Sequence, residues 1–296
     1  MRVLTFNVQN LRLRRPGGRE RLDGARDGPD PADPLDYADR RLTAAVLTAA
    51  NADVCALQEV FDRDSLDYFH DHLLHAAAPW PWRACLPGND GAGRDLALIA
   101  RRPFAAIGHA RLLPADLGMQ GFPGTRADLP LFSRDLLSAS FGPLTLFVVH
   151  FKSPYPDAQA AWPRRRAEAE ATRRLIARRF ADPGSALWLV LGDLNDPRDD
   201  AERAVAPLLA PFGVDLTLRM PESERWTWSQ DGERGCPDAM IASPALAARF
   251  PDAVPRAIRT GLGRDAGGVQ PRLEDVGLVR PRASDHAALV LDLPGL

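Results

Sequence analysis

The chain has one lysine, three cysteines and no apolar stretch long enough to cross a bilayer. Its formal net charge is only -2, so composition alone predicts no general attraction to nucleic acid or to an anionic membrane. Three cysteines cannot all pair, which favours a reduced protein over a disulfide scaffold. The first residues lack the charged and apolar regions of a signal peptide. We therefore expect a cytoplasmic protein without a membrane span; removal of a leader from a longer precursor would leave secretion open.

Length and apolar content are those of one large domain. The chain of 296 residues exceeds a typical domain, but architectures with two packed sheets reach this size, and 45% hydrophobic residues can fill a large core. We expect residues 1–296 to form a single domain. Residues 11–39, rich in Arg, Gly, Asp and Pro, predict a long polar loop. This loop would either contact phosphates through its arginines or be an ordinary solvated surface loop.

Four short apolar runs stop abruptly at polar residues. They are residues 3–6 before Asn7, residues 54–57 before Gln58 and Glu59, residues 144–149 before His150, and residues 187–191 before Gly192, Asp193 and Asn195. Apolar runs of this length predict buried strands, whose ends hold polar groups at a sheet edge. Asp285 and His286 instead precede an apolar run at 287–291, which predicts a strand of opposite direction. All five clusters are expected to meet at one edge.

The residue types at this edge suit metal-assisted chemistry. Carboxylate and amide oxygens are ligands for a hard divalent cation such as Mg²⁺, which usually keeps waters and substrate phosphates as further ligands. Two histidines would supply proton transfer and charge stabilisation. Each residue also has a purely structural interpretation, because a strand-end Asn can satisfy loop backbone groups, Asp193 can cap a helix, and a single His is usually just hydrogen-bonded.

The remaining patterns predict an α/β sandwich. A stripe of apolar residues at helical spacing lies within 42–49, and further helices are expected over 62–76 and 157–180. The last of these carries seven arginines, which we interpret as a solvated helix surface, with nucleic-acid contact as the alternative. Residues 136–149, interrupted by Gly142 and Pro143, predict a hairpin. We expect two mixed sheets face to face with helices on both outer faces.

Six segments in order along the chain resemble the endonuclease/exonuclease/phosphatase superfamily, the fold of DNase I. They are TFNVQN (5–10), LQEV (57–60), HFKS (150–153), GDLND (192–196), PDAMIAS (237–243) and SDH (284–286). One such short motif would recur by chance, but six in order across nearly the whole chain make a specific signal. The resemblance implies a four-layer α/β sandwich and a phosphoric ester hydrolase that depends on Mg²⁺ or Mn²⁺.

The resemblance also implies roles for individual residues. Asn7, Glu59 and Asp285 correspond to metal ligands, the last directly or through water. The implied catalytic residues are His286 as general base, Asp238 as the carboxylate that orients it, His150 as a phosphate or leaving-group donor, and Asp193 and Asn195 as groups that position water and phosphate. Lys152, the lone lysine, and Arg134 are candidate substrate contacts, although Lys152 can equally be an ordinary exposed lysine. Asp95 is a candidate support for His150.

Substrate class is predicted less sharply. The segments NVQN and HFKS resemble bacterial nucleases of the superfamily more than its inositol phosphatases or sphingomyelinases, which favours DNA or RNA as the substrate. A phosphomonoesterase or phospholipase C-type enzyme that acts on a phosphorylated small molecule or lipid is the alternative, and a non-catalytic binding protein is a third. Val149, Gln9 and the positions of the three tyrosines depart from the superfamily pattern, so repair of abasic sites is not supported.

Overall fold

Two six-stranded sheets form the centre of the protein. A computed structural model describes residues 1–27, 33–74, 76, 79–197 and 202–296. The first sheet has the order β15 (Arg256–Ile258), β16 (Ala288–Asp292), β1 (Arg2–Leu11), β4 (Val54–Val60), β6 (Asp95–Ala100), β5 (Trp82–Leu86). The second has the order β11 (Val214–Asp215), β14 (Asp238–Ala242), β10 (Leu187–Asp193), β9 (Leu144–His150), β8 (Leu136–Phe141), β7 (Ala106–Gly108). The hairpin predicted over 136–149 is confirmed as β8 and β9.

Strand direction explains how the polar clusters come together. Each sheet has one parallel pair, β1 with β4 and β9 with β10, so that Asn7 lies opposite Gln58 and His150 opposite Asp193. Strands β16 and β14 run antiparallel to β1 and β10, and Asp238, the first residue of β14, lies opposite Asp193. The carboxyl ends of the parallel strands and the starts of their antiparallel neighbours therefore share one edge of each sheet.

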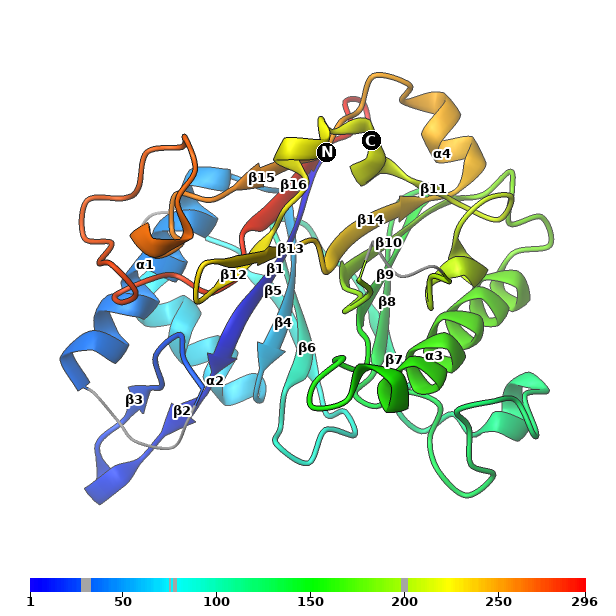
Figure 1. The fold of residues 1–296 in the computed structure, drawn as a ribbon, viewed down its shortest axis with the longest axis horizontal. Coiled ribbons are helices and arrows are strands. Elements are labelled where there is room, and N and C mark those ends of the chain that lie inside the picture. Colours follow the sequence, from blue (N-terminus) through cyan, green and yellow to red (C-terminus); the bar gives the residue numbers. More distant parts are fainter. Residues whose placement is uncertain (28–32, 75, 77–78, 198–201) are drawn as a thin grey trace.

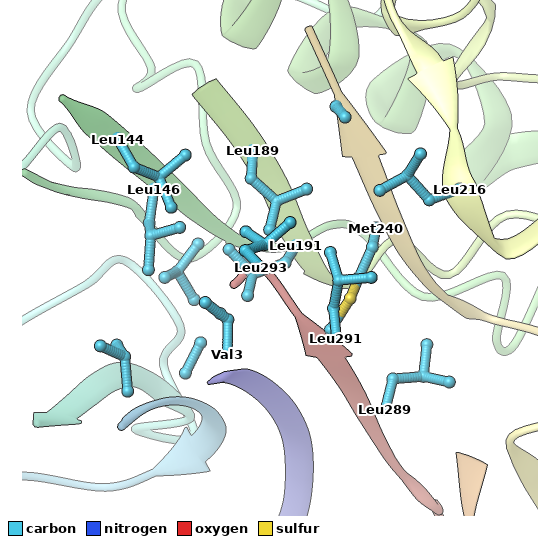
Figure 2. Close-up of a cluster of buried hydrophobic side chains, with 14 of the residues drawn as sticks. Val3, Leu144, Leu146, Leu189, Leu191, Leu216, Met240, Leu289, Leu291 and Leu293 are labelled. Atoms are coloured by element: carbon cyan, nitrogen blue, oxygen red, sulfur yellow. The ribbon is translucent and has the colours of Figure 1, made fainter. Parts of the chain in front are cut away.

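The layers follow from three hydrophobic clusters. Side chains between the sheets, including Leu98, Leu146 and Leu191, form the central cluster, part of which is drawn in Figure 2. A second cluster joins the first sheet to α1 (Asp33–Ala50) and α2 (Arg63–Phe69). A third joins the second sheet to α3 (Ala158–Arg179). Figure 1 shows α1 and α2 on one side of the sheets and α3 on the other, so the predicted four-layer α/β sandwich is confirmed.

The other elements are short. They are β2 (Leu13–Arg14), β3 (Arg21–Leu22), β12 (Trp228–Gln230), β13 (Glu233–Gly235), α4 (Pro244–Arg249), the π-helix His70–Leu74 and 3-10 helices at Pro16–Gly18, Pro114–Leu117, Ala206–Leu208, Leu216–Arg219, Glu222–Glu224 and Arg264–Ala266. The helix expected over 62–76 is thus α2 followed by the π-helix. Residues 75, 77 and 78 are not among the residues that the structure describes. None of the helices in the described ranges is long and apolar enough to span a membrane.

The prediction of one long loop over residues 11–39 is wrong. Strands β2 and β3 pair within it, and α1 already begins at Asp33; residues 28–32 lie outside the described part. The buried Arg40 guanidinium donates to the carbonyls of Val8, Gln9, Asp23 and Gly24 at 2.5–2.7 Å. A charge-rich composition predicts a solvated loop, but here one buried arginine donates hydrogen bonds to four backbone carbonyls and so holds the segment in place.

The arginines of α3 are not a uniformly solvated surface either. Arg165 is fully buried and donates to the Lys152 carbonyl at 3.0 Å. Arg174 donates to the carbonyls of Leu117 and Gly118 at 2.9 and 2.7 Å, and Arg164 donates to that of Pro130 at 2.6 Å. The long connection between β7 and β8 is therefore fixed to the outer face of α3. Our interpretation of these arginines as a solvated face is corrected for these three.

Asp135 should make the stability of the protein dependent on pH. This side chain is 1% exposed, accepts from the backbone amides of His109 and Leu136, and its pKa is raised by burial to about 7. Between its ordinary pKa and this value the folded state binds a proton that the unfolded state lacks, so stability falls as pH rises from about 4 to about 7.

Urea denaturation of the wild type and of Asp135→Asn checks this. We expect the uncharged variant to gain stability relative to wild type between pH 4 and pH 8, by on the order of 4 kcal/mol at most. Because the two proteins share every other titrating group, the difference reports Asp135 alone. An equal pH dependence of the two proteins would contradict the prediction.

Candidate active site

Strand ends place a carboxylate and an amide of the first sheet against the second sheet. Asn7, 2% exposed on β1, donates through Nδ2 to Oε1 of Glu59 at 3.2 Å and to Oδ2 of Asp193 at 3.1 Å. Glu59, near the end of β4, has the left-handed φ of 64°, which non-glycine residues adopt at a cost of about 1–2 kcal/mol. This backbone turn interrupts the register of β4 with β6. Burial raises the pKa of Glu59, and the negative charge of the nearby Asp285 raises it further.

The side-chain oxygen Oδ2 of Asp193 lies close to polar groups from both sheets. Besides Asn7, Oδ2 of Asp193 lies 3.4 Å from Nε2 of His150 and 3.9 Å from Nε2 of His286. Gly192 makes this possible, since its φ is 146° and a Cβ there would lie 1.9 Å from the carbonyl oxygen of Val149. His150, His286 and the side-chain amide of Asn7 therefore surround Oδ2 of Asp193 at the sheet edge.

His286 forms a His-carboxylate pair with Asp238. Its Nδ1 donates to Oδ2 of Asp238 at 2.8 Å, and the same oxygen accepts from the Thr227 hydroxyl at 2.6 Å. This fixes the ring so that Nε2 points to the Asp193 side. The arrangement is that of a general base whose other ring nitrogen is held by a carboxylate.

The charges at the site shift several pKa values. Burial lowers the pKa of His286, but Asp238, Asp193 and Asp285 outweigh burial and raise it to about 10. Burial and the nearby Arg134 hold the pKa of His150 well below its usual value, so this ring is neutral. Burial raises the pKa of Asp193 to about 6 and also raises that of Glu59. The site therefore combines one cationic and one neutral imidazole at neutral pH.

Comparison with known proteins now adds to this geometry. A sequence model described as Endonuclease/Exonuclease/phosphatase family matches residues 4–286. The chain belongs to this family. No curated protein matches the sequence. The match covers all the motifs that carried the resemblance, from Asn7 to His286, and confirms it.

Solved structures of the family have the same fold. A truncated Caenorhabditis elegans TDP2 has a TM-score of 0.55 and 18% identity over 98% of this chain and 96% of that one. An endonuclease/exonuclease/phosphatase from Beutenbergia cavernae gives 0.61 and 17% over 98% and 70%. The D. rerio TDP2 complexed with single strand DNA product gives 0.58 and 19% over 98% and 97%. At these identities the likeness concerns the fold.

The residues predicted as the core of the site lie together. Asn7, Glu59, His150, Asp193, Asp238, Asp285 and His286 are linked by the contacts above or by mutual charge effects. Asn195 lies beside them with φ 51°, but its Nδ2 donates to the Phe151 carbonyl at 3.2 Å and its backbone amide donates to Asp193 at 2.9 Å. Its side chain thus has the structural partner that a strand-end amide often finds.

Arg134 lies beside the site, whereas Lys152 and Asp95 have partners outside it. Arg134 is 8% exposed, donates to the Phe151 carbonyl at 2.9 Å and lowers the pKa of His150, so its charge lies beside the site. Lys152 is partly exposed, and its Nζ donates to the carbonyl of Tyr155 in its own loop at 3.1 Å. The idea that Asp95 supports His150 is wrong, because Asp95 accepts from the Gly88 amide and Nδ1 of His150 has no hydrogen-bond partner within the described ranges.

Several supporting residues were missed by the sequence analysis. Trp228 donates its indole N–H to Oδ2 of Asp285 at 3.2 Å, and Ser284 donates its hydroxyl to the Asn7 carbonyl at 2.7 Å. Thr227 holds Asp238, and Arg94 lies 3.6 Å from Oε2 of Glu59. Ser284 stood inside the SDH motif, whereas nothing in the sequence around Arg94 or Trp228 marked either of them.

The donor set fits a hard divalent cation that binds few protein groups. In the part of the chain that the structure describes, no cluster of three or more His, Cys, Asp or Glu has the arrangement of a metal site. The protein would instead supply the carboxylates of Glu59 and Asp285 and the amide of Asn7, which is enough for Mg²⁺ when water and substrate complete the shell. Burial, and to a smaller extent repulsion by Asp285, raises the pKa of Glu59, and a bound cation would offset both effects.

Proposed function

We propose that residues 1–296 form one catalytic domain that hydrolyses phosphodiesters of DNA or RNA with Mg²⁺ or Mn²⁺. The strongest support is the group of side chains that meet at Asp193. Its Oδ2 lies 3.1 Å from Nδ2 of Asn7, 3.4 Å from Nε2 of His150 and 3.9 Å from Nε2 of His286. Membership of a family of phosphoric ester hydrolases supports the reaction class.

Each residue has a role in the proposed reaction. His286, oriented by Asp238, takes the proton of the attacking water at Nε2, while Asp193 and Asn195 hold that water and the phosphate. Neutral His150 donates a hydrogen bond to the phosphate or to the leaving oxygen. When bound at Asn7, Glu59 and Asp285, the cation would polarise a phosphate oxygen and offset the carboxylate charge that keeps His286 protonated, favouring the neutral base.

Local charge favours a nucleic acid over an uncharged ester. Arg94 lies 3.6 Å from Oε2 of Glu59, burial together with the charges of Arg134 and Arg94 lowers the pKa of His150, and Lys152 follows His150 by two residues. The net charge of -2 gives the protein no overall attraction to a polyanion. A substrate that presents few phosphates at once, such as a single strand or an end, therefore fits better than a long duplex. One relative was solved with a single-stranded DNA product, which supports the same class.

A substrate panel tests the proposal. Single-stranded DNA, plasmid, RNA, bis-p-nitrophenyl phosphate, inositol phosphates and sphingomyelin are incubated with Mg²⁺, Mn²⁺, Ca²⁺ or chelator. We expect cleavage of nucleic acid with Mg²⁺ or Mn²⁺ and none with chelator. Activity confined to the inositol phosphates or to sphingomyelin would replace the nuclease by the phosphatase or phospholipase alternative. Absence of turnover with every substrate would favour a binding protein.

A further inference from the structure

Asn10 connects three segments to the carboxylate of Glu59. Its backbone N–H donates to Oε2 of Glu59 at 3.0 Å. Its side-chain Nδ2 donates to the Arg26 carbonyl at 2.9 Å and to Oδ1 of Asp27 at 3.0 Å, and its Oδ1 accepts from Nε of Arg94 at 2.9 Å. All hydrogen-bonding atoms of this side chain are thus used, although the residue lies at the rim of the site and is 9% exposed.

These contacts also fix the charge beside Glu59. Arg94 comes from the connection between β5 and β6, and its Nε lies 3.6 Å from Oε2 of Glu59 while Nη2 lies 3.5 Å from Asp27. Since the Arg94 side chain is 31% exposed, solvent alone would leave it free to turn away. Of the acceptors that hold it there, Oδ1 of Asn10 is nearer, at 2.9 Å from Nε, than Oδ1 of Asp27, at 3.5 Å from Nη2. The backbone of Asn10 has φ 56°, so the segment that carries this acceptor is itself in an uncommon conformation.

We propose that Asn10 is a positioning residue for the cation site: its side chain holds Arg94 and residues 26–27 against Glu59, so that the carboxylate keeps one orientation toward the cation. The inference rests on the proposed function, because it requires a cation at Glu59. Groups that hold a metal ligand in place commonly change metal affinity by about 10–100-fold when removed. Asn10 would act in this way without touching substrate or cation.

The variant Asn10→Gly isolates the side chain. Glycine adopts positive φ without strain and keeps the backbone N–H that donates to Glu59, so only the three side-chain contacts disappear. Asn51→Gly is the matched control: Asn51 also has positive φ, 50°, and its Oδ1 also accepts from an arginine, Arg101, at 2.5 Å, but it precedes β4 at the opposite end of the sheet from Glu59.

The measurement is the binding of Mn²⁺ alone, followed by the electron paramagnetic resonance signal of the free ion, together with kcat at rising Mn²⁺. We expect the Kd for Mn²⁺ to rise about 10-fold in Asn10→Gly and to stay unchanged in Asn51→Gly. Saturating Mn²⁺ should restore most of kcat, which a loss of folded protein would not allow. If Asn10→Gly does not fold, Arg94→Lys, which keeps the positive charge but loses the Nε–H that Asn10 accepts, tests the same network from its other end, with the same expected rise.

The remaining outcomes separate a failure of the positioning role from a failure of the proposed function. A wild-type Kd in Asn10→Gly, or an equal rise in both variants, would overturn the positioning role. A wild-type protein that binds no Mn²⁺ would instead overturn the proposed function, so the two failures are distinguishable.

Discussion

Replacing His286 with alanine is expected to lower kcat for phosphodiester cleavage by about 10²–10⁴-fold, the range that general acid–base catalysis supplies. The imidazole is 8% exposed, is held by Asp238 at 2.8 Å and faces Asp193 through its other nitrogen. No other histidine has both contacts among the described residues. Steady-state cleavage of single-stranded DNA or bis-p-nitrophenyl phosphate at saturating Mn²⁺ measures the loss.

Two further variants sharpen this prediction. His72→Ala is the control, because His72 is exposed on the π-helix that follows α2 and its Nδ1 donates to the Tyr68 carbonyl of α2. Asp238→Asn should approach the effect of His286→Ala, since an amide that donates to Nδ1 would reverse the tautomer that a base needs. A loss below about 10-fold in His286→Ala would be less than this kind of catalysis contributes and would remove His286 from the role of base.

Glu59→Gln is expected to abolish metal-dependent activity and weaken Mn²⁺ binding by at least about 100-fold, more than loss of a supporting group usually does. Glu59 is the carboxylate that Asn7 and the Asn10 amide hold in place, and burial raises its pKa. A raised pKa means that the fold disfavours the ionised form, and a bound cation offsets this cost, so Mn²⁺ should raise the Tm of the wild type. The same variant should lose the increase in Tm that Mn²⁺ gives the wild type.

Thermal unfolding with chelator and with Mn²⁺ measures both effects. Glu20→Gln is the matched control, because Glu20 pairs with Arg15 at 3.0 Å and both side chains are about half exposed, at 45% and 53%. This control should keep the Mn²⁺-dependent rise and change the Tm little, as surface ion pairs contribute about 0–1 kcal/mol. A Glu59→Gln protein that is still stabilised by Mn²⁺ to the same extent would exclude Glu59 as a ligand.

Much of the site could be predicted because each residue follows or precedes an apolar run. Strand direction then determines that such residues meet, as His150 and Asp193 do in the register of β9 with β10. The sequence could not predict how the side chains turn at that edge. The left-handed backbone of Glu59 directs its carboxylate to Asn7 and to the Asn10 amide, and the LQEV motif has no glycine that would mark such a turn.

Buried charge explains the errors in the fold. Residues 11–39 were predicted to be a loop because their composition is polar, yet Asp39 is fully buried and accepts from the side chain of Arg280 and the backbone amide of Arg282. These partners are more than 200 positions away in the sequence, so no local pattern reports them. The sequence also does not distinguish an arginine whose guanidinium donates to backbone carbonyls, as Arg174 does, from one that is solvated.

We propose that Asn7, Glu59 and Asp285 bind a divalent cation beside His286 and His150. Anomalous diffraction at the manganese edge from crystals soaked in Mn²⁺ tests it most directly. We expect a single strong peak within coordination distance of Glu59 and Asp285, absent from crystals of Glu59→Gln. A fully occupied Mn²⁺ elsewhere in the protein, with these two carboxylates turned away from it, would contradict the claim.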